Sequence, residues 1–224
     1  MTALKTAAIL FDLGGTLDAD GVTWKDRFHA LLASDGHDVP KEAFDPAFYA
    51  ADDALVGRIP RDLSFRETVR LLSEGLTRHL AIFGAGEKLA ERFASESENV
   101  LRSRAALLGR LRAAHRLGVV SNFYGNLERV LSDVGLGGFF ETAIDSEVVG
   151  FGKPDARIFR AALGTLGVAE GDALFVGDSR ARDMEGARRI GMRHVWLRQE
   201  NGASPCCEDD RVISRLEELS EVVS

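Results

Sequence analysis

The stretch AAILFDLGGTL, residues 7–17, decides the fold of this chain. Five apolar residues precede Asp12, and a short apolar run of this kind is typical of a buried strand in a parallel sheet. Gly14 and Gly15 follow the carboxylate, and glycines at such a position allow close approach of the backbone to a ligand. Taken alone, Asp12 and Thr16 also suit an ordinary turn in which both bond local amides. The stretch therefore predicts a buried strand that ends at a carboxylate.

Similar apolar runs recur along the chain, and helical patterns separate them. The later runs cover residues 117–120, 143–144, 173–176 and 194–197. Apolar residues at helical spacing fill residues 127–134, 158–166 and 184–190, and these patterns end at Gly135, Gly167 and Gly191. Strands that alternate with helices predict an α/β fold with a doubly wound, parallel, Rossmann-like sheet.

The segment from Ala19 to Ser97 breaks this alternation, because its pattern is helical throughout. Ser64 and Glu67 form a capping-box pattern. One helical face then carries a row of apolar residues: Phe65, Val69, Leu72, Leu76 and Leu80. We interpret residues 19–97 as an inserted α-helical cap. The core is then discontinuous and comprises residues 1–18 and 98–224.

Composition narrows the class of protein. A length of 224 residues suggests one domain, or one domain carrying an insertion. Hydrophobic residues make up 45% and charged residues 28%, which is ordinary for a globular protein. The net charge is −7 and no run of Lys or Arg occurs, so we expect no nucleic-acid partner. Adjacent Cys206 and Cys207 cannot build a disulfide framework, and no stretch suits a signal or a membrane span. We expect a cytoplasmic protein without a membrane partner, either a monomer or a homodimer.

Two further motifs follow the second strand and the third predicted strand. Ser121 and Asn122 end a strand, where a hydroxyl and an amide could hold a phosphoryl oxygen or could cap a helix. Lys153 stands in the sequence Gly-Lys-Pro-Asp, and Pro154 is expected to start a helix. A lysine there could neutralise phosphate charge, although a solvated surface lysine is the commoner case.

The fourth motif holds two carboxylates, Asp178 and Asp183, directly after a strand. Mg²⁺ prefers oxygen ligands and usually takes one or two carboxylates together with a substrate phosphate. The alternative is that Asp178 or Ser179 merely caps the next helix. Ligands of open α/β sheets bind outside the carboxyl ends of the strands, so all four motifs are expected to converge on one cleft.

Together the four motifs resemble the haloacid-dehalogenase-like superfamily, whose pattern is D-x-D-G-T, then S/T, then K, then G-D-x₃₋₄-D. The resemblance covers residues 7–18 and about 100–198, whereas the segment interpreted as the cap matches only in position and length. It implies a Mg²⁺-dependent hydrolase that acts on a small phosphorylated substrate.

The resemblance also implies roles for single residues. Asp12 would attack phosphorus and form an aspartyl-phosphate, while Ser121 and Lys153 would assist catalysis. Substrate binding is assigned to Thr16, Ser121, Asn122 and Lys153. The Mg²⁺ ligands and their support would be Asp12, the main-chain carbonyl of Gly14, Asp178 and Asp183.

One position departs from the family pattern. The second aspartate of D-x-D, which protonates the leaving group in the family's phosphatases, is Gly14 here. General acid–base help is typically worth about 10²–10⁴ in rate. The change predicts poor hydrolysis of alkyl phosphates, although a glycine carbonyl still suits a metal.

Three other functions stay open. A 2-haloacid dehalogenase also lacks the second aspartate, but it uses no metal and has no need to gather Asp178 and Asp183 beside the nucleophile. A phosphonate hydrolase needs a Schiff-base lysine in the cap, where Lys25, Lys41 and Lys88 are the candidates. A non-catalytic binding protein could keep the fold and the metal site.

The predicted cap holds the side chains that would select the substrate. Four aromatic residues there could reach the cleft, although such residues are more often core. They are Trp24, Phe44, Phe48 and Tyr49. The five histidines show no metal-ligand pairing and are interpreted as surface or packing residues: His29, His37, His79, His115 and His194.

Overall fold

The computed structural model describes residues 6–199 and 211–223. Six parallel strands form one sheet in the order β3-β2-β1-β4-β5-β6. The strands are β1 (Ala8–Phe11), β2 (Arg116–Ser121), β3 (Thr142–Asp145), β4 (Ala173–Gly177), β5 (Arg193–Leu197) and β6 (Arg211–Ile213). The predicted α/β class with a parallel, Rossmann-like sheet is confirmed. Strand β6 was not predicted, because a three-residue edge strand with two exposed residues leaves little pattern. Cys206 and Cys207 lie outside the described residues.

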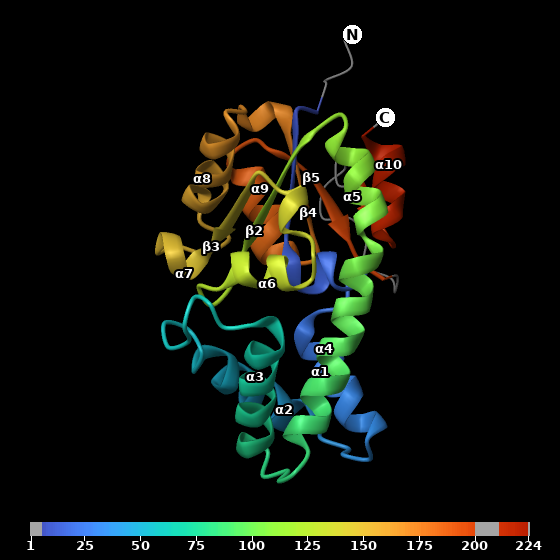
Figure 1. Cartoon of the computed structure of the whole chain (residues 1–224), viewed down its shortest axis with the longest axis vertical. Helices are drawn as coiled ribbons and strands as arrows, with labels where there is room; N and C mark the ends of the chain where they lie inside the picture. Colours follow the sequence, from blue (N-terminus) through green and yellow to red (C-terminus); the bar gives the residue numbers. More distant parts are fainter. Residues whose placement is uncertain (1–5, 200–210, 224) are drawn as a thin grey trace.

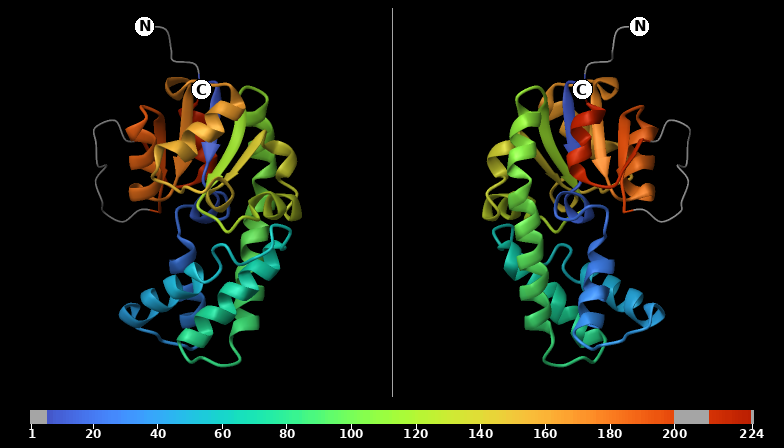
Figure 2. Two further views of the ribbon diagram at one scale, coloured as in Figure 1. Left: turned by 90° about the vertical axis from the view of Figure 1, so that its left-hand side faces the viewer. Right: turned by 90° about the vertical axis from the view of Figure 1, so that its right-hand side faces the viewer.

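Helices cover both faces of the sheet (Figures 1 and 2). They are α5 (Ala105–Arg112), α6 (Leu127–Asp133), α7 (Ser146–Val149), α8 (Ala156–Leu166), α9 (Glu185–Arg189) and α10 (Leu219–Val222), with short turns η2 (Gly137–Phe139), η3 (Glu170–Asp172) and η5 (Leu216–Glu218). In β1, Ala8 and Leu10 belong to the apolar cluster of α8 and α9, whereas Ile9 and Phe11 belong to the cluster of α5, α6 and α10. Burial on both faces explains why β1 is apolar at every position.

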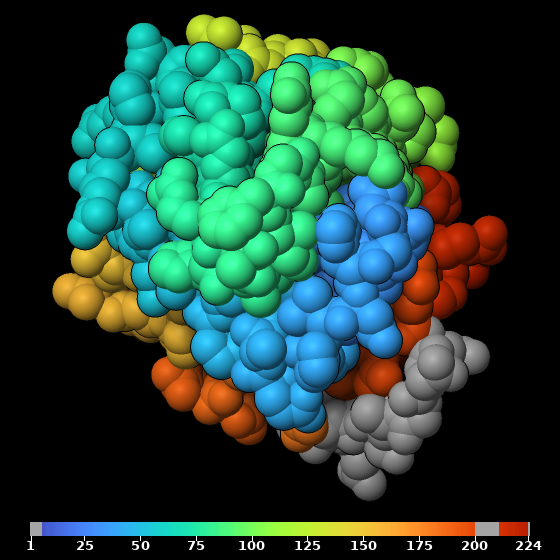
Figure 3. All heavy atoms as spheres, turned by 90° about the horizontal axis from the view of Figure 1, so that it is seen from below, coloured from blue at the N-terminus to red at the C-terminus, as the bar shows by residue number. Residues whose placement is uncertain are grey.

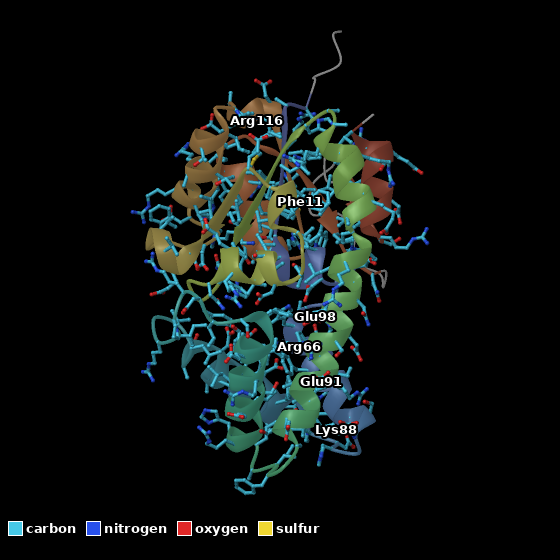
Figure 4. All side chains as sticks on the ribbon, viewed as in Figure 1. Phe11, Arg66, Lys88, Glu91, Glu98 and Arg116 are labelled. Carbon is cyan, nitrogen blue, oxygen red and sulfur yellow. The ribbon has the colours of Figure 1, made fainter. Side chains whose placement is uncertain are left out.

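Four helices lie together beyond the carboxyl ends of the strands (Figure 1). We call α1 (Trp24–Ser34), α2 (Lys41–Asp53), α3 (Phe65–His79) and α4 (Gly86–Ser103) the helical unit. The capping box of Ser64 and Glu67 is present at the start of α3. Arg66 joins α3 to α4 through ion pairs of 2.6 Å to Glu91 and 2.7 Å to Glu98 (Figure 4). Seen from its own end, the helical unit covers most of the core (Figure 3).

The place of the helical unit follows from where it enters the chain. It is inserted directly after β1, so its first helix begins close to the residues that end the strands. Helix α4 continues across the predicted boundary between residues 97 and 98 and is followed almost at once by α5 (Figure 1). The division into residues 1–18, 19–97 and 98–224 stays a prediction.

The ends of three helices agree with the sequence prediction, and the start of α8 does not. Gly135, Gly167 and Gly191 follow their helices with positive φ, as predicted. Pro154 does not start α8; Asp155 caps that helix instead, and its side chain accepts a hydrogen bond from the backbone N–H of Arg157.

Among the described helices, none combines the length and the apolar character needed to cross a membrane.

Candidate active site

Asp12 stands at the end of β1 and is 8% exposed. Three donors converge on its Oδ1: the Leu13 amide at 2.7 Å, the Ser121 hydroxyl at 2.9 Å and the Lys153 ammonium at 2.8 Å. Among the described residues, no hydrogen bond reaches Oδ2. The protein therefore fixes one carboxylate oxygen and leaves the other for a ligand.

Lys153 is buried, with 5% of its surface exposed, so the alternative of a solvated surface lysine is wrong. Its Nζ lies 2.8 Å from Asp12 Oδ1 and 2.7 Å from Asp183 Oδ1. Burial alone would lower the pKa of this lysine, but the two carboxylates outweigh burial and raise the pKa above its usual value. The side chain is therefore a fixed positive charge.

Asn122 holds Lys153 in place through its backbone. The Asn122 amide accepts a hydrogen bond of 2.6 Å from the Lys153 N–H and donates one of 3.0 Å to the Lys153 carbonyl. Both ends of the amide are thus used within the protein. This arrangement favours a positioning role for Asn122 over the predicted contact with substrate.

Three carboxylates gather at this point. Oxygens of Asp12, Asp178 and Asp183 lie within 4.8 Å of one another. Burial raises the pKa of Asp178 well above its usual value, and the negative charges of Asp12 and Asp183 add to the shift. Burial likewise raises the pKa of Asp183, to about 6. One ammonium does not balance three clustered carboxylates, so an oxygen-liganded cation such as Mg²⁺ fits this donor set.

The loop after β1, named η1 (Leu13–Leu17), brings Asp178 close. Gly15 has φ +85°, and a Cβ atom there would lie 2.4 Å from Asp178 Oδ2, so only glycine fits. Thr16 is fully buried and donates a hydrogen bond of 3.2 Å to Asp178 Oδ1. The structure therefore places Thr16 beside the acidic cluster and outside the cavity lining, although it was predicted to bind substrate.

The residues after β4 differ in whether they cap the helical turn that follows. Ser179 caps the short turn η4 (Arg180–Met184), and its backbone N–H donates to Asp183 Oδ2 at 2.9 Å. Asp178 caps no helix, since its carboxylate contacts Thr16. The capping alternative thus holds for Ser179 and fails for Asp178.

A cavity of about 380 Å³ separates the strand ends from the helical unit. Its core side is lined by Asp12, Gly14, Ser121, Asn122, Lys153, Asp178, Ser179 and Arg182, joined by Phe123 and Tyr124. The opposite side is lined by Thr23, Trp24, Lys25, Asp26, Phe48, Tyr49 and Asp52. Three of the four aromatic candidates therefore reach the cavity, while Phe44 is buried inside the helical unit.

His29, Lys25 and Lys88 of the helical unit have other partners. His29 contacts the Val39 carbonyl and packs on Phe44, which is a packing role. Lys25 lines the cavity, yet its hydrogen bond to Asp45 raises its pKa and keeps it an ammonium rather than a free amine. Lys88 lies at the far end of the helical unit (Figure 4).

Two carboxylates, the buried Asp18 and the half-buried Asp52, were not predicted from the sequence. Asp18 accepts hydrogen bonds from the Gly15 amide, Trp24 Nε1, Arg27 and Ser97, and so ties η1 to α1 and α4. Burial raises the pKa of Asp18, and Arg27 opposes that rise. An acid one residue after the first motif was a weak signal that could have pointed to it.

The second missed carboxylate is Asp52, which accepts a hydrogen bond from the Tyr124 hydroxyl across the cavity. Burial raises the pKa of Asp52, although Tyr124 opposes the shift. Burial, and then the charge of Asp52, raise the pKa of Tyr124 well above its usual value. No sequence motif surrounds either residue, so only the packing of α2 on the core reveals the pair.

The model of the haloacid dehalogenase-like hydrolase family matches residues 6–191. The chain belongs to this family. Its relatives include haloacid dehalogenase-like hydrolase domain-containing protein 3 of Bos taurus, 37% identical over 131 residues, which cover 58% of this chain and 52% of that protein. Phosphoserine phosphatase of Thermus thermophilus is 38% identical over 107 residues, covering 47% of this chain and 42% of that one. The matched region is thus about half of each relative's length.

The same fold occurs in a solved structure that is named for a different activity. The L-2-haloacid dehalogenase RSc1362 has a TM-score of 0.64 and 17% identity, over 98% of this haloacid dehalogenase-like chain and 99% of that one. At this identity the likeness establishes the fold alone. The fold does not determine which reaction the present chain catalyses; the residues of its site do.

Proposed function

We propose that this chain is a Mg²⁺-dependent phosphatase that forms an aspartyl-phosphate at Asp12. One observation carries the proposal. The carboxylate of Asp12, the ammonium of Lys153 and the acidic cluster meet at the floor of one cavity. Covalent catalysis needs a nucleophile whose partners fix its geometry, and phosphoryl transfer needs positive charge around the phosphate oxygens.

The chemistry assigned to the protein's own groups has two steps. Asp12 attacks phosphorus, the bond from phosphorus to the leaving oxygen breaks, and the electron pair departs with that oxygen. Water then attacks the aspartyl-phosphate, releases orthophosphate and regenerates the carboxylate. Ser121 donates a hydrogen bond toward the phosphoryl oxygens, and Lys153 offsets charge on Asp12 and on phosphate.

Asp12, Asp178 and the Gly14 carbonyl would hold Mg²⁺, and Asp183 would support the site through Lys153 and the Ser179 amide. When bound, the ion would neutralise charge on the phosphate oxygens. Gly14 supplies no general acid, so we propose that the leaving oxygen takes its proton from water.

The alternatives have less support. A dehalogenase without metal gives no reason to gather three carboxylates within 4.8 Å of one another beside this cavity. A phosphonate hydrolase needs a neutral lysine, whereas Lys25 is paired with Asp45. The relative named phosphoserine phosphatase also favours phosphate esters. We further propose that the helical unit is the substrate-selecting cap and that the substrate is a small phosphorylated molecule.

The test is a panel of phosphate esters, phosphonates and 2-haloacids, assayed with Mg²⁺ and with chelator. We expect phosphate release that requires Mg²⁺, and calorimetric Mg²⁺ binding that Asp178→Ala weakens severely. Halide release that persists in chelator would overturn the proposal in favour of the dehalogenase. Absence of turnover across the whole panel would favour a binding protein.

A further inference from the structure

Gly14 leaves a space that another side chain fills. Its backbone angles, φ −75° and ψ 121°, are ordinary for any residue. A Cβ atom there would lie 3.1 Å from Trp24 Nε1 and 3.3 Å from Trp24 Cδ1. The indole of Trp24 therefore crowds the place where an acidic side chain would begin.

Trp24 is held firmly in this place. Its Nε1 donates a hydrogen bond of 2.7 Å to the buried carboxylate of Asp18. Its ring packs edge-on against Phe93 and Phe123, with centroids 5.1 and 5.9 Å away. The hydrogen bond to Asp18 and the contacts with Phe93 and Phe123 fix the orientation of the indole beside Gly14.

Further aromatic rings extend this wall. Tyr124 packs against Phe123 with centroids 4.9 Å apart, and Phe48 and Tyr49 line the cavity from α2. Tyr49 is 45% exposed, and the Lys25 ammonium lies over its ring with Nζ 5.2 Å from the centroid. The end of the cavity that faces the helical unit is thus bounded by rings from two separate parts of the fold.

We propose that this aromatic wall is a leaving-group site for aryl phosphates, in which phosphate is joined directly to a planar ring. The inference rests on the proposed function, because it places the phosphate at Asp12. Two separate observations point to the same class. Aromatic rings favour contact with another flat ring, and the absence of an acid at Gly14 favours a leaving group that is stable as an anion.

The electron balance explains why the two features belong together. When Asp12 attacks phosphorus, the bond to the aryl oxygen breaks and its electron pair stays on that oxygen. The ring delocalises the charge of the resulting phenolate, which then takes a proton from water. An alkoxide has no such delocalisation and needs a proton as it departs, which the indole beside Gly14 cannot supply.

The test measures binding of two phosphonates that Asp12 cannot hydrolyse, in calorimetry with Mg²⁺. Phenylphosphonate and cyclohexylphosphonate have rings of similar size, and only the first is flat. We expect phenylphosphonate to bind roughly 3- to 10-fold tighter, as for an ordinary aromatic pair. Tyr49→Leu and Trp24→Leu should each reduce this preference. Phe83→Leu is the matched control, because Phe83 is 83% exposed and lies outside the cavity lining.

The outcomes separate this inference from the proposed function. Equal affinity of the two phosphonates in the wild type, or a preference that both cavity variants retain, overturns the aromatic site. A preference for phenylphosphonate without hydrolysis of any phosphate ester supports the site and overturns the phosphatase. If Trp24→Leu fails to fold, the half-exposed Tyr49 still decides the result.

Discussion

The two sides of the cavity differ in how deeply their charged side chains are buried. On the core side, buried charges are fixed by one another, as where Lys153 joins Asp12 and Asp183. On the side of the helical unit, Lys25 lines the cavity in a partly exposed ion pair with Asp45, and the two side chains are 22% and 36% exposed. Exposed pairs contribute little energy, whereas a buried pair is costly to break.

This difference indicates a division of labour. The core side holds charged groups in a single geometry, which is what a reaction at phosphorus requires. The helical unit offers rings and weakly held charges, which can change without disturbing the reacting groups. We therefore propose that the core carries the chemistry and that the helical unit selects the substrate, and four predictions test that division.

The largest effect is expected for the nucleophile. Asp12→Asn should lower turnover by roughly 10⁴-fold or more, because an amide is a poor nucleophile. Asp26→Asn, at a carboxylate on the other side of the same cavity, should change turnover less than about tenfold. Phosphate release measures both, and mass spectrometry should detect phosphate on the Asp12 peptide of the wild type. If Asp12→Asn and Asp26→Asn lowered turnover by similar factors, the proposed division between the core and the helical unit would be contradicted.

The second prediction compares two lysines that line the cavity. Lys153→Met leaves the Asp12 and Asp183 carboxylates buried without their cation, and should lower the free energy of unfolding by roughly 3–5 kcal/mol. Lys25→Met removes a partly exposed pair and should cost less than about 1 kcal/mol. Urea denaturation in chelator measures both values. If Lys25→Met lowers the free energy of unfolding as much as Lys153→Met does, the ion pairs on the two sides of the cavity do not differ in their contribution to stability.

The third prediction concerns Gly14 and Trp24, where the two sides meet. Gly14→Asp alone should gain no activity on alkyl phosphates, since the indole of Trp24 crowds the space that the new side chain needs. Gly14→Asp combined with Trp24→Leu should gain about 10²-fold, the lower end of general acid catalysis. Rates on a series of esters with different leaving groups provide the measurement. A gain from Gly14→Asp alone would mean that Trp24 moves aside freely.

The smallest effect is a change of stability with pH. The pKa of Asp183 is about 6 in the folded protein, above its ordinary value of 3.8, so the folded state binds this proton more tightly. Its contribution to stability is present below pH 3.8 and is lost as pH rises through about 6. Mg²⁺ competes with the proton, so the increase in Tm on adding Mg²⁺ should be small at about pH 5 and larger at about pH 7. An increase that is the same at both pH values would count against metal binding here.

The sequence by itself determined the core and the residues that meet in it. Short apolar runs that alternate with helical patterns specify a parallel sheet, and the carboxyl ends of parallel strands share one edge. Polar residues placed just after those strands therefore had to converge. Asp12, Ser121, Lys153 and Asp178 do line one cavity, although they are far apart in the chain. Their roles stay a prediction.

Only the tertiary structure decided what the helical unit brings to this cavity. Trp24 covers Gly14, Asp18 joins η1 to α1 and α4, and Asp52 meets Tyr124. None of these contacts has a sequence spacing of its own, because each depends on how the helices pack against the core. Helical periodicity reports which face of a helix is buried, but not which partner buries it.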